Sequence, residues 1–100
     1  MLKHVILWKL KDEYSQIEKA EIKRNIKTGL ESLLGKIQGL TEIKVYTDGL
    51  NSSTVDLMLD STFENELALK AYSVHPAHVA VADTFVRPYT AVRSCFDFEI

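Results

Sequence analysis

The residues best suited to chemistry in this 100-residue sequence are a tyrosine and three histidines. Tyr72 and His78 bracket the run Tyr-Ser-Val-His-Pro-Ala-His, and His4 lies near the start of the chain. A neutral buried imidazole is a general base near neutral pH, and a phenol donates a hydrogen bond to a developing enolate oxygen. Tyr72, His78 and His4 therefore suit the abstraction of a proton next to a carbonyl.

The same segment also has a purely structural interpretation. His75 precedes Pro76, a residue that suits the first turn of a helix, so we expect His75 to cap a helix there. Tyr72 and His75 could then pair with backbone groups that a helix end leaves without partners. For His4 and His78 both interpretations stay open, because one fold can host many functions or none.

A metal site is a weaker alternative. His75 and His78 have the spacing of two ligands on one helical turn, but a third and usually a fourth ligand are needed, and only His4 or Asp83 is at hand. Cys95 is the one cysteine, and we interpret it as a small apolar residue of a strand. The sequence thus predicts no metal, and nothing in it specifies haem or another cofactor.

The first half of the chain predicts a strand followed by a helix. Residues 2–10 alternate with a period of two, which places His4 on the more apolar face of a strand. Ser15 and Glu18 have the spacing of a capping box, which predicts the start of a helix. That helix has apolar residues every three or four positions and ends near Gly35, so we expect it to lie on a sheet.

The second half predicts a hairpin, two helical pieces and a last strand. A helix should begin at Ser61, because Ser61 and Glu64 repeat the capping-box spacing. Another should begin at Pro76 and stop before Pro88. The expected strands are 41–48, about 54–61 and 92–99, and the expected helices run from 61 to about 74 and from 76 to about 87.

The order β-α-β-β-α-β, with an extra helical piece before the last strand, predicts an α+β ferredoxin-like fold with four antiparallel strands and helices on one face. The other face mixes apolar groups with charges of both signs, which favours burial against a second copy in an isologous homodimer. Arg93, Asp97 and Glu99 are interpreted as ion pairs on this face or at its rim, without a chemical role. The members expected on this face are Val5, Leu7, Lys9, Lys44, Tyr46, Asp56, Met58, Asp60, Arg93 and Cys95.

Composition excludes several classes of protein. With 46% hydrophobic and 26% charged residues, the chain can build one core, so we expect one domain over residues 1–100. The net charge of −2, with cations scattered among anions, argues against a nucleic-acid partner. Lys9 and Lys11 interrupt the apolar start, and no later run approaches membrane-spanning length. We therefore expect a cytoplasmic protein without a membrane partner.

Several segments together resemble a known family. Residues 3–11, the central Ser-Thr-Phe-Glu at 61–64, residues 71–78 and the ending at 93–99 are similar to the stress-responsive A/B barrel domain family. The likeness covers essentially the whole chain, and Tyr-x-x-His-Pro-x-His is its most specific part. The resemblance implies a homodimer in which two sheets pack into an α+β barrel, in a family whose members mostly have no assigned activity.

One plant member of that family is a polyketide cyclase that closes a linear tetraketide by aldol condensation. By resemblance, its tyrosine and histidine fall on Tyr72 and His78, and its first-strand histidine falls on His4. The chain departs from that enzyme at Leu57, where the enzyme has another histidine. It also departs at Trp8, whose indole can fill space that an acyl chain needs.

Two functional hypotheses result. The first is a stress-associated homodimer that binds a small apolar or aromatic molecule between sheet and helices, without catalysis. The second is a cofactor-free cyclase or lyase that uses His78 as general base, with Tyr72 and His4 orienting the substrate oxygen. Whether the chain is an enzyme stays open, and the volume of the cavity separates the two hypotheses. The residues expected to line that cavity are Ile6, Trp8, Ile22, Ile26, Leu57, Leu59 and Phe85.

Overall fold

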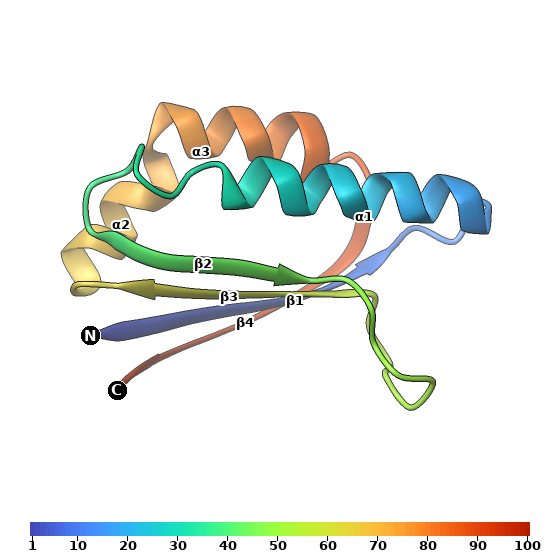
Figure 1. The fold of residues 1–100 in the computed structure, drawn as a ribbon, viewed down its shortest axis with the longest axis horizontal. Coiled ribbons are helices and arrows are strands. Elements are labelled where there is room, and N and C mark those ends of the chain that lie inside the picture. The colour runs from blue at the N-terminus through green and yellow to red at the C-terminus, as the bar shows by residue number, and fades with distance from the viewer.

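The computed structural model describes residues 1–100 and contains a four-stranded antiparallel sheet with the strand order β2-β3-β1-β4. The helices cover one face of this sheet, and the other face is bare (Figure 1). This arrangement confirms the predicted ferredoxin-like α+β fold. The elements are β1 (Leu2–Leu10), α1 (Gln16–Glu31), β2 (Leu40–Tyr46), β3 (Leu57–Phe63), α2 (Glu66–Val74), α3 (Pro76–Val81), the π-helical turn η1 (Ala82–Val86) and β4 (Thr90–Glu99).

Strand β1 lies inside the sheet because it pairs with both β3 and β4. Its even-numbered residues from Leu2 to Leu10 are all buried, while the odd-numbered ones stay partly or fully exposed. The period of two therefore separates a helix-facing side from an open side, as the sequence predicts. His4 lies on the helix-facing side, 6% exposed.

Helix α1 begins where the capping box predicts. The Ser15 hydroxyl accepts a hydrogen bond from the Glu18 N–H, and the Glu18 carboxylate accepts one from the Ser15 N–H. The chain then turns back to the sheet through Gly39, whose φ of 87° favours glycine. A Cβ at Gly39 would also lie 2.5 Å from the Cβ of Ala68. No helix of the chain combines the length and the apolar character needed to cross a membrane.

The second predicted capping box is wrong. Ser61 lies inside β3, and its hydroxyl donates to the carbonyl oxygen of His4 at 2.8 Å. Helix α2 begins later, with the Asn65 side chain accepting from the N–H of Ala68 at 2.9 Å. The reason is tertiary: Ser61 and Thr62 are paired with β1, and those strand hydrogen bonds override a local spacing that would also fit a helix start.

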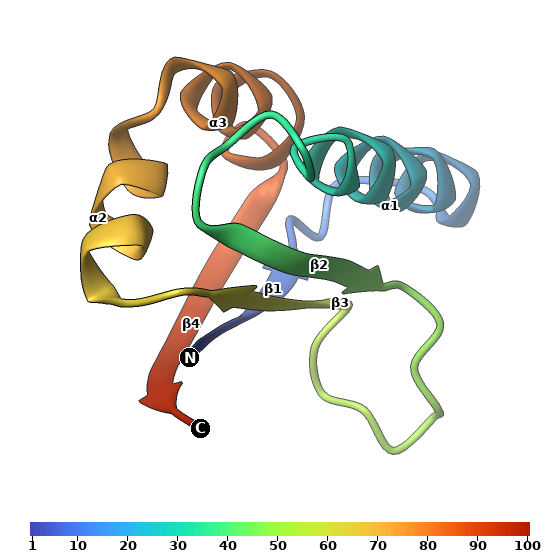
Figure 2. The same cartoon turned by 60° about the vertical axis from the view of Figure 1, so that its left-hand side comes forward.

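The junction between α2 and α3 agrees with the prediction. The Nδ1 atom of His75 accepts a hydrogen bond from the N–H of Ala77 at 3.0 Å, and Pro76 occupies the first helical turn. Figure 2 shows α2 at the edge of the sheet and α3 beside α1 above it. Helix α3 passes into η1, which ends before Pro88, as expected for the residues that precede a proline.

Strand β4 faces the opposite way from the prediction. Its register sets Arg93 opposite Trp8 and Cys95 opposite Ile6, so both lie on the helix-facing side of the sheet. The expected dimer-face positions of Arg93 and Cys95 are therefore wrong. Val92, Ser94, Phe96 and Phe98 take the outer side instead. We expected polar residues outside, but on this edge strand the apolar residues face outwards.

Candidate functional site

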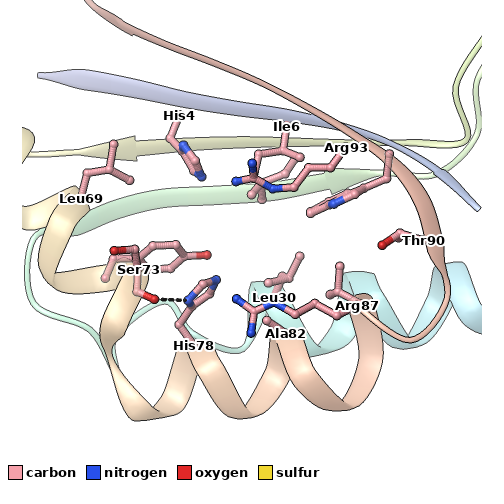
Figure 3. A pocket seen from close by; sticks show the side chains of 14 residues that line it. His4, Ile6, Leu30, Leu69, Ser73, His78, Ala82, Arg87, Thr90 and Arg93 are labelled. Atoms are coloured by element: carbon pink, nitrogen blue, oxygen red, sulfur yellow. Dashed lines mark hydrogen bonds between the residues drawn. The ribbon is translucent and has the colours of Figure 1, made fainter.

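A pocket of about 130 Å³ lies between the inner face of the sheet and the helices above it (Figure 3). Strands β1, β3 and β4 supply one wall, and α1, α2, α3 and η1 supply the other. The pocket brings together the three residues predicted to carry chemistry, His4, Tyr72 and His78. Its apolar lining residues are Ile6, Trp8, Leu30, Leu59, Leu69, Ala82 and Val86.

His78 presents a free ring nitrogen. Its Nδ1 lies 3.3 Å from the carbonyl oxygen of Ser73, and a carbonyl only accepts, so Nδ1 carries the proton. The lone pair is then on Nε2. Burial lowers the pKa of His78, and the charge on Arg87 adds to this, although the hydrogen bond to Ser73 opposes it. His78 is therefore a neutral base at pH 7.

His4 is held by a residue to which the sequence interpretation assigned no chemical role. The carboxylate of Asp97 lies 2.5 Å from His4 Nδ1, and the register sets the two residues directly opposite each other on β1 and β4. The carboxylate accepts, so Nδ1 of His4 donates. The placement of Asp97 at the dimer face or its rim is thus wrong. The alternation of β4 predicts that Asp97 shares one side of the strand with Arg93 and Cys95. It does not say whether that side faces the helices or the solvent.

Tyr72 is 2% exposed, and its hydroxyl has no hydrogen-bond partner. Its ring lies against that of His78, with centroids 4.2 Å apart and planes at 33°. It also packs edge to face against the ring of Phe63, with centroids 4.9 Å apart. Burial raises the pKa of Tyr72, so the phenol keeps its proton at neutral pH. An unpaired donor in the wall of a pocket is available to a ligand oxygen.

Only part of the expected lining is found at this pocket. Ile6, Trp8 and Leu59 line it, whereas Ile22 and Phe85 border a separate groove between α1 and the end of η1. Ile26 and Leu57 are buried in the core and line neither. Ile22 and Ile26 do not line the pocket because α1 contacts it only through Leu30, one helical turn beyond Ile26.

One group of side chains could hold a metal ion. His4, Cys95 and Asp97 each offer a ligand atom, and these atoms lie within 4.8 Å of one another. The Asp97 carboxylate there already accepts from His4, and burial together with Asp97 raises the pKa of the Cys95 thiol. His75 and His78, the weaker alternative considered from their spacing, are not part of this group.

The fold and the pocket define a small ferredoxin-like α+β protein in which His4, Tyr72 and His78 line a pocket between sheet and helices. Residues 2–100 match the family model described as the stress responsive A/B barrel domain. The chain therefore belongs to the stress-responsive A/B barrel domain family, as its sequence motifs indicate.

Solved structures with the same fold include several dimers. A dimeric protein of unknown function with a ferredoxin-like fold from Bacteroides fragilis NCTC 9343 is 31% identical, with a TM-score of 0.92, and the match covers 99% of this chain and 95% of that one. A dimeric ferredoxin-like protein of unknown function from Thermobifida fusca YX is 24% identical, with a TM-score of 0.81 and coverage of 99% and 90%. A hydroxynitrile lyase from Passiflora edulis is 18% identical, with a TM-score of 0.73 and coverage of 99% and 92%. A search of curated proteins finds no match.

Proposed function

We propose that this protein is a homodimer that binds a small apolar or aromatic molecule in the pocket beside His78. The observation that carries the proposal is the combination of an apolar lining with two unused polar atoms, the Tyr72 hydroxyl and Nε2 of His78. Pockets for small ligands typically combine mostly apolar walls with a few such polar groups. A cytoplasmic location, expected from the sequence, is part of the same proposal.

The size of the pocket limits the ligand. An apolar cavity of about 150 Å³ accommodates benzene, whereas pockets for drug-sized molecules have about 300–1,000 Å³. At about 130 Å³, with the buried indole of Trp8 in its wall, the pocket has room for about one ring, so a short substituent would lie towards its mouth. This volume argues against a long linear polyketide as the ligand.

The outer sheet face supports the homodimer. Val92, Phe96 and Phe98 on β4 are 51%, 68% and 39% exposed, and Tyr46 on β2 is 47% exposed. Exposed apolar side chains gathered on one face of a sheet usually mark an interface. An ion pair between Lys3 and Asp60, 3.0 Å apart, lies on the same face. The proposed partner is a second copy, in line with the dimeric relatives.

Ligand binding can be tested with acetophenone, a single ring that carries a carbonyl. Trp8 is the only tryptophan and lines the pocket, so its fluorescence reports binding directly. We expect His78→Ala to weaken binding with little change in Tm. His75→Ala is the matched control: it should keep binding and lose about 1 kcal/mol of stability, because it removes the cap of α3.

Two results would contradict the proposal. Saturating amounts of acetophenone and of other single-ring probes that leave Trp8 fluorescence unchanged would show that the pocket takes no such ligand. A large drop in Tm for His78→Ala, with unchanged binding, would make His78 a structural residue.

A second candidate is a cofactor-free lyase or cyclase acting on a small carbonyl compound. It is favoured by the neutral His78 ring with a free Nε2 next to the unpaired phenol of Tyr72. In this reaction Nε2 takes a proton from the carbon beside the carbonyl. The C–H electron pair moves into the enolate, whose oxygen accepts a hydrogen bond from Tyr72. His4, oriented by Asp97, offers a second nitrogen to the same pocket.

Hydrogen exchange tests this candidate without a natural substrate. In D₂O the enzyme should replace the methyl hydrogens of acetophenone with deuterium faster than buffer does, as followed by NMR. Because general-base catalysis contributes about 10²–10⁴-fold, His78→Ala should lose about 100-fold or more of the catalysed rate. Exchange at the rate of buffer alone, or exchange that continues at the same rate in His78→Ala, would contradict the enzyme hypothesis. The hypothesis of a binding protein without catalysis would then remain.

A further inference from the structure

The pocket carries positive charge that no carboxylate in its wall compensates. Its 14 lining residues include Arg87 and Arg93 and no aspartate or glutamate. The nearby carboxylates are already engaged, Asp83 with Arg87 and Asp97 with His4. Arg93 forms no ion pair with a carboxylate. An uncompensated guanidinium at the edge of an apolar pocket favours an anion there.

The two guanidinium groups reach this pocket from opposite walls. Figure 3 shows Arg93 beside His4 on the sheet side and Arg87 beside His78 on the helix side. Arg93 faces inwards because its register partner is Trp8, and Arg87 comes directly after the last residue of η1. Arg87 and Arg93 both stay exposed, so they mark the mouth of the pocket, while Trp8 and Leu59 form its buried interior.

Charge and shape together specify the chemistry of a ligand. A guanidinium presents parallel N–H donors that match the two oxygens of a carboxylate, and the apolar interior suits a ring. We propose that the pocket binds a single-ring aromatic carboxylate, with its carboxylate at Arg93 and its ring against Trp8. Arg87 contributes less, because it shares its charge with Asp83. This inference rests on the proposed function and names the class of molecule for the same site.

Benzoate and benzamide test this inference, because they share a ring and differ in charge. In calorimetric titrations at low ionic strength, benzoate should bind about tenfold or more tightly than benzamide, since a hydrogen bond to a charged group adds that much affinity. Added salt should weaken the binding of benzoate and leave the binding of benzamide unchanged. Arg93→Gln should remove the preference for benzoate, and Arg87→Gln should reduce it by a smaller factor.

Arg24→Gln is the matched control. Besides Arg87 and Arg93 the chain has one other arginine, Arg24, which is exposed on α1 and does not line the pocket. Its loss should leave the preference for benzoate over benzamide unchanged. Circular dichroism melting of each variant checks that it folds. A preference lost equally in Arg24→Gln would be an effect of net charge and would overturn the inference.

Other outcomes separate this inference from the proposed function. Equal binding of benzoate and benzamide overturns the carboxylate inference and leaves a neutral-ligand site in place. No binding of benzoate, benzamide or acetophenone overturns both. Inorganic phosphate that displaces benzoate at comparable concentration would indicate a simple anion site at the mouth, and would also overturn the inference, because the ring would then contribute nothing.

Discussion

The two sides of β4 differ in polarity and in what they face. On the helix-facing side Arg93 lines the pocket and Asp97 accepts a hydrogen bond from His4, and on the outer side Phe96 and Phe98 are exposed to solvent. In β1 the helix-facing side is the more apolar one. The neighbouring strands thus have opposite polarity, because β1 covers the core while β4, at the edge, lies between the charged mouth of the pocket and an open apolar face.

This contrast suits an edge strand to the two proposed functions, dimerisation and ligand binding. Its helix-facing side is not needed to fill the core, so it is free to hold a carboxylate against His4 and a guanidinium over the pocket. Its outer side can be apolar only if something covers it, since a long uncovered apolar edge is prone to aggregation. A change confined to one side should therefore affect one function and spare the other.

The largest effect is expected on the outer side. Phe96→Asp should dissociate the proposed dimer, because burying a phenylalanine contributes about 1.5–3 kcal/mol and an isologous interface contains the residue twice. The dimer should weaken by about 10²–10⁴-fold, as measured by light scattering over a dilution series. Ile17→Asp on α1, where Ile17 is 83% exposed, is the control and should stay dimeric. A dimeric Phe96→Asp would place the interface elsewhere.

On the helix-facing side, Asp97→Asn should cost less. It replaces a charge-assisted hydrogen bond to His4, and because Asp97 is 39% exposed we expect a loss of only about 1 kcal/mol in the free energy of unfolding. Binding of pocket ligands should also weaken, since His4 loses its fixed orientation. Glu99→Gln removes the same charge two residues away and should change neither property. Equal effects of the two variants would mean that only net charge matters.

Tyr72→Phe should separate stability from binding. The buried hydroxyl has no partner, so its removal should leave stability unchanged or raise it by about 1 kcal/mol. Ligands with a carbonyl should nevertheless bind more weakly, because they lose their hydrogen-bond donor. Urea denaturation and acetophenone titration measure the two properties. A clear loss of stability would show that the hydroxyl has a partner in solution.

The smallest effect is a dependence of stability on pH. The pKa of His78 is lower in the folded chain than its unfolded value of 6.5, mainly because of burial. Its contribution is complete above pH 6.5 and is lost as the pH falls through the folded-state pKa, because the unfolded chain binds the proton first. The urea midpoint should thus be lower at about pH 5.5 than at about pH 7.5. In His78→Gln the difference between the two urea midpoints should be smaller. An unchanged difference would mean that other titrating groups cause the pH dependence.

The sequence predicted the parts of the fold that local patterns decide. The alternation of β1, the capping box at Ser15 and the cap at His75 depend on neighbours within a few residues, so they can be interpreted without a structure. The same patterns predicted that Tyr72 and His78 lie near each other. The meeting of these residues with His4 results from the strand order, which the ferredoxin-like arrangement supplied.

The remaining features depend on contacts between distant segments. Ser61 fits a helix cap by spacing, and only its pairing with β1 shows that it belongs to a strand. The phase of β4 could not be read from hydrophobicity, because its apolar side faces outwards. The helix-facing positions of Asp97 and Arg93 were missed for that reason. The reach of α1 was also not predictable: Leu30 rather than Ile26 lines the pocket.

The π-helical turn η1 has a consequence for how such a pocket can arise. The N–H of Arg87 donates to the carbonyl of Ala82, five residues back, at 2.8 Å, so this turn holds one residue more than an α-helical turn. Deleting one residue here, such as the exposed Thr84, would allow the bonding of an α-helix, four residues back. The turn would then be narrower, and Ala82, Val86 and Arg87, which it presents to the pocket, would be spaced differently. The shape of the pocket can thus change through the length of one wall segment, without a substitution among the residues that line it.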